Sequence, residues 1–157
     1  MAIYNLAPSF KGSSACVGSS QENVTALYEF QTNSSGILVG SSASAALAIA
    51  DKIRVAFLDE GFEATDAAAL VSTAAGQAAT ANIGFEYVDG VDDSSYPQSA
   101  TAFFSALALN SAARTRTTSA KVIRPLPKPA YLTVTIAGAA LSSALVAQIV
   151  LNGVQRS

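Results

Sequence analysis

The chain has 157 residues, which suits one domain, and only 13% of them are charged. It contains no His and a single Cys, so catalytic groups built on histidine, zinc sites made of Cys and His, and an internal disulfide are all excluded. This composition favours a structural or binding module over an enzyme.

Charge is distributed unevenly along the chain. All eleven acidic residues lie at or before Asp93, and together with three basic residues they give residues 1–93 a formal charge of −8. Residues 94–157 contain six basic residues and no acid, a formal charge of +6. If the fold keeps the two halves apart, the molecule is a dipole suited to ordered contacts between copies. If the fold intermixes them, these charges cancel in space.

Residues 1–23 are expected to form an extended N-terminal arm that precedes a β-sandwich domain of residues 24–157. The arm is rich in Ser and Gly and has no hydrophobic period, so we expect it to become ordered on a neighbouring subunit. Its isolated apolar residues are candidate anchors in a partner's groove: Ile3, Tyr4, Leu6 and Phe10. Cys16, in the same segment, is interpreted as a bystander thiol or as one half of an intermolecular bridge.

Alternation of apolar and polar residues predicts strands in the first part of the domain. In Val24–Gln31, one face carries Val24, Ala26, Tyr28 and Phe30. Lys52–Leu58 alternates in the same way, with Ile53, Val55 and Phe57 expected to face inward. Between these runs, the turn signal of residues 33–36 precedes the segment 41–51, which is interpreted as strand or loop.

Further strands are predicted in the second part. Residues 67–73 form a short apolar run, and Asn82–Val88 has Ile83, Phe85 and Tyr87 on its inner face, with Gly84 marking the close approach of a backbone or an aromatic ring. The remaining candidates are 103–109 (strand or short helix), 120–123, 131–136 with Leu132, Val134 and Ile136 inward, and 146–151. Three alternating prolines at 125, 127 and 129 favour a rigid connector or an edge. Roughly eight short strands predict an all-β fold, a β-sandwich or jelly roll.

Few residues are suited to chemistry. No phosphate-binding glycine motif occurs, and the acidic residues lie mostly at predicted strand ends, where solvated turns are the simpler interpretation than a pair of glycosidase carboxylates. Asp89, Asp92 and Asp93 share one predicted loop, so either a calcium site or a plain acidic turn is open there. We expect no cofactor and no enzymatic activity.

The basic residues after Asp93 are candidates for contact with a partner. They include Arg114, Arg116, Lys121 and Arg124, and the alternatives are a solvated rim, an acidic protein surface or phosphate. Interleaved aromatic residues are missing, so nucleic acid is not expected. No signal peptide or apolar run of membrane-spanning length is found, which predicts synthesis in a cytoplasm without membrane contact.

Several short blocks occur in an order that resembles a known family. They are Lys52–Leu58, Gly84–Gly90 with Asp92, Asp93 and Pro97 behind it, Phe103-Phe104, Ala113–Arg116 and Pro127–Gly138. Their order and spacing resemble those of small virion proteins of tailed bacteriophages, usually encoded beside the major capsid protein. The resemblance covers about residues 50–153 and offers no catalytic residues.

The resemblance implies a capsid decoration (cement) protein, a non-enzymatic β-sandwich that binds the head shell and stabilises it. The implied partners are the major capsid protein and further copies of the chain, as a dimer or trimer, on the virion surface. The alternative is another virion part, such as a head fibre base, a tail component or a module that binds host carbohydrate. Copy number per particle separates these two hypotheses.

Overall fold

The computed structural model describes residues 1–6, 22–118 and 124–156. Over these residues the chain forms nine strands and no helix. The strands are β1 (Ile3–Asn5), β2 (Glu22–Thr32), β3 (Lys52–Leu58), β4 (Phe62–Thr73), β5 (Thr80–Tyr87), β6 (Ser99–Ala108), β7 (Ala113–Arg116), β8 (Ala130–Ala137) and β9 (Leu145–Gln155).

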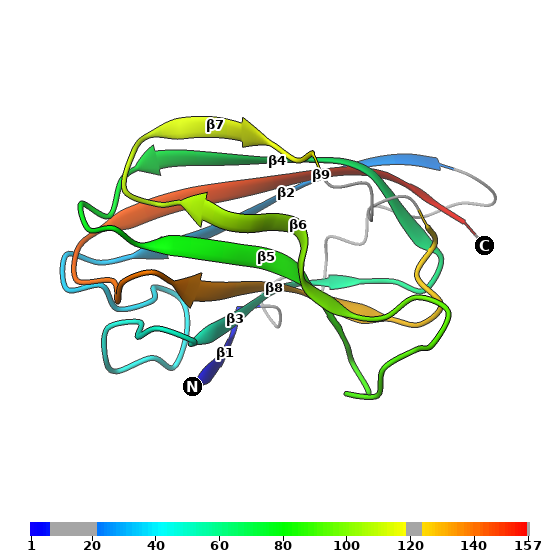
Figure 1. Cartoon of the computed structure of the whole chain (residues 1–157), viewed down its shortest axis with the longest axis horizontal. Helices are drawn as coiled ribbons and strands as arrows, with labels where there is room; N and C mark the ends of the chain where they lie inside the picture. The colour runs from blue at the N-terminus through cyan, green and yellow to red at the C-terminus, as the bar shows by residue number, and fades with distance from the viewer. Residues whose placement is uncertain (7–21, 119–123, 157) are drawn as a thin grey trace.

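The strands form two sheets that lie face to face (Figure 1). One sheet has five strands in the order β1-β3-β8-β5-β6, and the other has four in the order β2-β9-β4-β7. All pairs are antiparallel except β1 with β3. Side chains from both inner faces, among them Phe30, Ile83 and Ile149, are almost completely buried between the sheets. The predicted all-β sandwich is therefore confirmed.

Eight of the nine residues predicted for the inner faces are buried, each at most 3% exposed: Ile53, Val55, Ile83, Phe85, Tyr87, Leu132, Val134 and Ile136. The prediction for Phe57 is wrong, because its side chain is 47% exposed. The pairing of β3 with β8 shifts register between Arg54 and Ala56. This bulge leaves Val55 and Ala56 both buried and reverses the alternation after them, so Phe57 points outward.

Other boundaries differ from those expected. The short run 67–73 is the end of the 12-residue strand β4, and the ambiguous run 103–109 belongs to strand β6. Strand β7 was not among the predicted strands, and β9 continues beyond the predicted end at residue 151 to Gln155. Gly153 within it packs against Phe62 and Glu63 of β4. The predicted strand 120–123 lies outside the described residues.

The close approach predicted at Gly84 is confirmed. A Cβ atom at this position would lie 1.9 Å from the carbonyl oxygen of Ser99, at the start of β6. Residues 88–98, which connect β5 to β6, project from one end of the sandwich (Figure 1). The contact at Gly84 thus fixes one strand against the other where this projecting loop begins and ends.

Candidate interaction surfaces

Of the predicted arm, residues 3–6 lie on the edge of the five-stranded sheet, whereas residues 22–23 begin strand β2 of the other sheet. Strand β1 pairs with β3, and the backbone N–H of Leu6 donates to the carbonyl of Arg54 at 2.9 Å. Leu6 is buried in the core and Tyr4 packs against it, whereas Ile3 is 44% exposed. Residues 3–6 are therefore held by their own chain, and of these three anchors only Ile3 presents a large apolar surface. Phe10 lies outside the described residues, and the division at residue 23 stays a prediction.

The predicted basic residues are spread over one end and one edge. Arg114 and Arg116 lie on the edge strand β7, and the Arg116 Nε donates to Asp66 Oδ1 at 2.9 Å. This hydrogen bond from Arg116 holds the pKa of the Asp66 carboxyl below its ordinary value. Arg124 donates to the carbonyl of Ser95 at 3.4 Å, and Lys121 lies outside the described residues.

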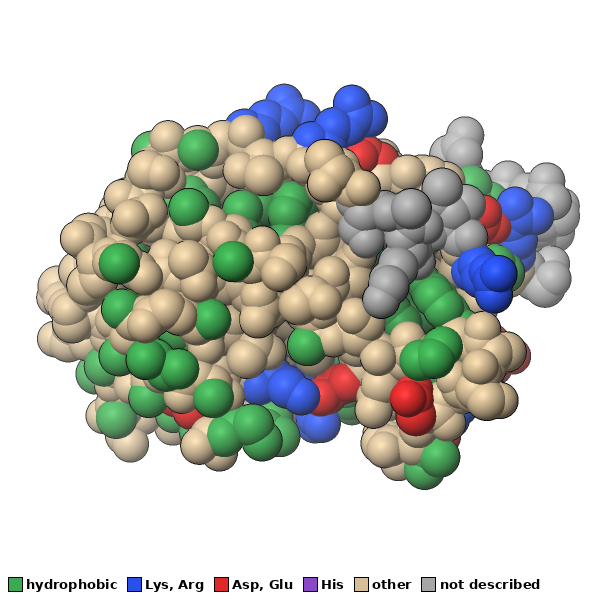
Figure 2. All heavy atoms as spheres, in the orientation of Figure 1, with side chains coloured by type: hydrophobic (Ala, Val, Ile, Leu, Met, Phe, Trp, Pro, Cys, Tyr) green, Lys and Arg blue, Asp and Glu red, His purple; other side chains and the backbone are tan. Residues whose placement is uncertain are grey.

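The acidic and basic halves of the sequence intermix in the fold. Within the described residues, three ion pairs join residues 1–93 to residues 94–157: Arg116 with Asp66, Lys128 with Asp89, and Arg156 with Glu63. Figure 2 shows a face on which charged side chains occur in small groups among uncharged ones. The fold therefore does not separate the charges of the two halves of the sequence into a dipole. Arg114 stays exposed on β7, with no described acid paired to it.

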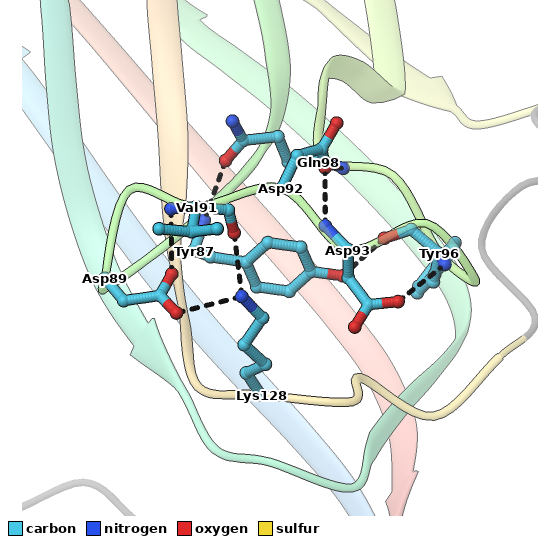
Figure 3. Close-up of polar contacts among 8 residues, drawn as sticks. All are labelled: Tyr87, Asp89, Val91, Asp92, Asp93, Tyr96, Gln98 and Lys128. Atoms are coloured by element: carbon cyan, nitrogen blue, oxygen red, sulfur yellow. Dashed lines mark hydrogen bonds and ion pairs between the residues drawn. The ribbon is translucent and has the colours of Figure 1, made fainter.

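The projecting loop of residues 88–98 is built around its three aspartates (Figure 3). Asp89 Oδ1 accepts from the N–H of Val91 at 2.9 Å, and Asp92 Oδ1 accepts from the N–H of Gln98 at 2.7 Å. Asp93 Oδ1 accepts from the N–H groups of Ser95 and Tyr96. These bonds satisfy the loop's backbone locally, as Asp side chains commonly do in turns, so the acidic residues act here as a scaffold.

Tyr87 and Lys128 attach the loop to the sandwich. The buried Tyr87 donates its hydroxyl to the carbonyl of Tyr96 at 2.5 Å, and its N–H donates to Gln98 Oε1 at 3.1 Å. Lys128 Nζ lies 4.9 Å from the centre of the Tyr87 ring and donates to Asp89 Oδ2 and the carbonyl of Val91, each at 2.8 Å (Figure 3). Burial, reinforced by the nearby Asp93 carboxylate, raises the pKa of Tyr87 to about 12, so this phenol stays a hydrogen-bond donor.

The loop therefore presents a preorganised surface that includes two exposed apolar side chains. Val91 is 61% exposed and Val88 is 40% exposed. Of the alternatives open for Asp89, Asp92 and Asp93, the geometry favours the acidic turn, because their oxygens face backbone N–H groups and Lys128. Among the described residues, no group of three or more His, Cys, Asp or Glu side chains is placed to hold a metal ion.

A second surface cluster lies on the outer face of the five-stranded sheet. Lys52 Nζ and Arg54 Nε both bind the Glu86 carboxylate, at 2.5 Å and 2.7 Å. Burial works to raise the pKa of Glu86, but the hydrogen bonds from these two cations outweigh it and the pKa lies below its ordinary value. The Arg54 guanidinium also stacks 4.6 Å from the centre of the Tyr131 ring, and Tyr131 meets Phe57 edge to face. Sequence reasoning missed this cluster, because the bulge that exposes Phe57 leaves no mark in the alternation.

At the loop end, the described side chains that pack below the loop enclose little space. The depression lined by Phe62, Phe85, Tyr96, Phe103 and Arg124, among others, has a volume of about 10 Å³, which is room for roughly one water molecule. In residues 1–6, 22–118 and 124–156 there is also no helix long and apolar enough to cross a membrane. A wider depression, open to solvent and about 440 Å³ in volume, is lined by Glu60, Gly61, Pro125, Leu126, Gln155 and Arg156.

Two solved structures share the fold. One chain, from a structure titled "Capsid of Ralstonia phage GP4", matches with a TM-score of 0.57 and 15% sequence identity, over 88% of this chain and 86% of that one. Another, from "Cyanophage Pam1 capsid asymmetric unit", matches with a TM-score of 0.52 and 17% identity, over 92% of this chain and 94% of that one. No protein-family model and no curated protein matches the sequence.

Proposed function

We propose that the protein is a bacteriophage capsid decoration (cement) protein, which binds the outside of the head shell and stabilises it without catalysing a reaction. The observation that carries the proposal is the fold shared with two chains from phage capsid structures, along nearly the full length of all three chains. The order of sequence blocks that resembles small virion proteins is an independent argument. On this proposal the protein is made in the host cytoplasm and functions on the virion surface.

The proposed mechanism is attachment of many copies through modest contacts. Each copy binds the major capsid protein, and neighbouring copies contact one another, so that the loss of one contact does not release the layer. A surface with few long charged side chains suits this task, because short Ala, Ser and Thr side chains lose little entropy when they are ordered at a contact.

Two described surfaces are suited to hold the shell. The loop of residues 88–98 projects from one end and is fixed by Lys128 and Tyr87, so it can be inserted into a contact without a large ordering cost. Arg114 and Arg116 on β7 offer positive charge to an acidic partner. The anchor role of Ile3 and Phe10, and the partner contacts of Lys121 and Arg124, belong to the same proposal, whereas Tyr4 and Leu6 are occupied by the core of their own chain.

The test is binding to shells assembled from the major capsid protein of the same phage. Purified protein should sediment with these shells until a fixed ratio is reached, and the bound shells should resist heating better than bare ones. Shells of an unrelated phage serve as the control. If the protein fails to bind, or binds without raising the temperature at which shells break, the cement role is wrong, and a tail or fibre position becomes the better hypothesis.

A further inference from the structure

The two sheets have four edges, and three of them are protected against pairing with another chain. Strand β1 has only three residues, and β7 has four, all exposed, including two arginines. Strand β6 shifts register against β5 twice, and Ala106 within it has a φ of 52°. Short length, charge and irregularity are the usual means by which proteins prevent edge strands from associating.

Strand β2 lacks the short length, the irregularity and the basic residues of the other edges. It spans 11 residues, from Glu22 to Thr32, and its sequence contains no Lys, Arg or Pro. Its register with β9 runs without a shift, from Glu22 opposite Gln155 to Thr32 opposite Leu145. A long, regular edge whose charged residues are two glutamates, Glu22 and Glu29, is a template for strand pairing.

The backbone groups on the open side of β2 can be identified. The N–H of Val39 donates to the carbonyl of Gln31 at 2.9 Å from the side away from β9, so Gln31 points to the open edge. Because alternate residues of a strand point their backbone groups the same way, Thr25, Leu27 and Glu29 do so too. No described residue bonds their backbone N–H or C=O groups on that side. The Leu27 side chain, in the middle of this stretch, is 58% exposed.

We propose that β2 pairs antiparallel with β2 of a second copy, around a two-fold axis at Leu27. In this register Leu27 lies opposite Leu27 of the other copy, and each Thr25 lies opposite a Glu29, which gives about six backbone hydrogen bonds. The two four-stranded sheets become one sheet of eight strands, and the contact is the same patch on both subunits.

Charge and apolar pattern select this register and this occupant. A pairing centred on Glu29 would set two carboxylates opposite each other, which destabilises a sheet. A pairing centred on Leu27 avoids that and joins two apolar leucines. Leu27, Val150 and Ala68 are cross-strand neighbours on β2, β9 and β4. The pairing centred on Leu27 extends this apolar row across the two-fold axis into the second copy.

The first experiment measures the mass of the purified protein in solution by light scattering and sedimentation. The native chain should be a dimer, and Leu27→Lys, which sets two positive charges together at the axis, should be a monomer with unchanged circular dichroism. Leu70→Lys is the matched control, because Leu70 is 38% exposed on the central strand β4, away from the edge, and should remain a dimer.

A second experiment fixes the register by disulfide formation in a Cys16→Ser background. Leu27→Cys should oxidise to a cross-linked dimer, since directly opposite residues lie within disulfide reach. Thr25→Cys alone and Glu29→Cys alone should not, because each lies about 14 Å along the strand from its own copy, whereas a mixture of the two variants should cross-link.

A monomeric native chain, equal behaviour of Leu27→Lys and Leu70→Lys, or self-cross-linking of Thr25→Cys would each overturn the proposal. A monomer whose binding to shells is abolished by Leu27→Lys would assign the β2 edge to a strand of the shell protein instead. These measurements need no phage particle, so they can refute the dimer while the proposed function stands. Shell-binding experiments can likewise refute the proposed function while the dimer stands.

Discussion

Replacing Gly84 with Ala should separate β5 from β6 at the base of the projecting loop. The added Cβ atom would lie 1.9 Å from the Ser99 carbonyl oxygen, and 2.5 Å and 2.8 Å from the carbonyl carbon and Cα of Ala100. All three are backbone atoms, so no side-chain rotation relieves the overlap. Restoring a separation of 3.0 Å requires β6 to move by about 1 Å, which breaks the pairing of Phe85 with Ser99.

The expected cost of this substitution is about 2–4 kcal/mol, from overpacking and the loss of about one backbone hydrogen bond. Urea unfolding gives the total loss of stability, and amide hydrogen exchange at Gln98 and Ser99 shows whether the start of β6 has loosened. Gly90→Ala is the control, because nothing lies within 4 Å of its Cβ position and only its φ of 70° opposes the change. It should cost about 1–2 kcal/mol. The reasoning fails if Gly84→Ala costs no more than Gly90→Ala, or if exchange at Gln98 and Ser99 is unchanged.

Three further outcomes are expected. Phe85→Ala should cost about 3–5 kcal/mol in urea unfolding, whereas Phe57→Ala, at a position 47% exposed, should cost about 1 kcal/mol or less; similar costs would contradict the bulge. Glu86→Gln should lower the free energy of unfolding by its full amount above pH 4.5, the ordinary pKa of this carboxyl. Because the folded-state pKa is lowered, this loss should shrink progressively as pH falls below 4.5. A loss that does not vary with pH in unfolding titrations would refute this. Arg114→Glu combined with Arg116→Glu should weaken shell binding and its salt sensitivity, and unchanged binding would leave β7 a solvated rim.

The fold could be predicted from the sequence where a local pattern carries the information. Strict alternation in Asn82–Val88 places Ile83, Phe85 and Tyr87 inward, and a lone glycine on the other face signals the contact with β6. Both are properties of one strand, so no knowledge of its neighbours is needed. The alternating prolines at 125, 127 and 129 are also a local signal, and they lie in the connection between β7 and β8.

The contacts that build the surface clusters join residues distant in sequence, and sequence reasoning missed these contacts for that reason. The bulge at Val55 arises from pairing with β8, and it decides that Phe57 joins Tyr131 and Arg54 on the outer face. The pairing of Lys128 with Asp89 requires the segment before β8 to lie beside the loop after β5. The protection of three edges and the openness of β2 likewise follow from the strand order, which alternation alone does not give.

The proposed function places this gene in a bacteriophage, and electron cryomicroscopy of the intact particle of that phage would test it most directly. The account predicts β-sandwich density of this fold repeated over the outside of the head, in numbers comparable to those of the major capsid protein, and missing from particles in which the gene is deleted. Density confined to the tail, to one vertex or to fibres, or particles identical with and without the gene, would contradict it.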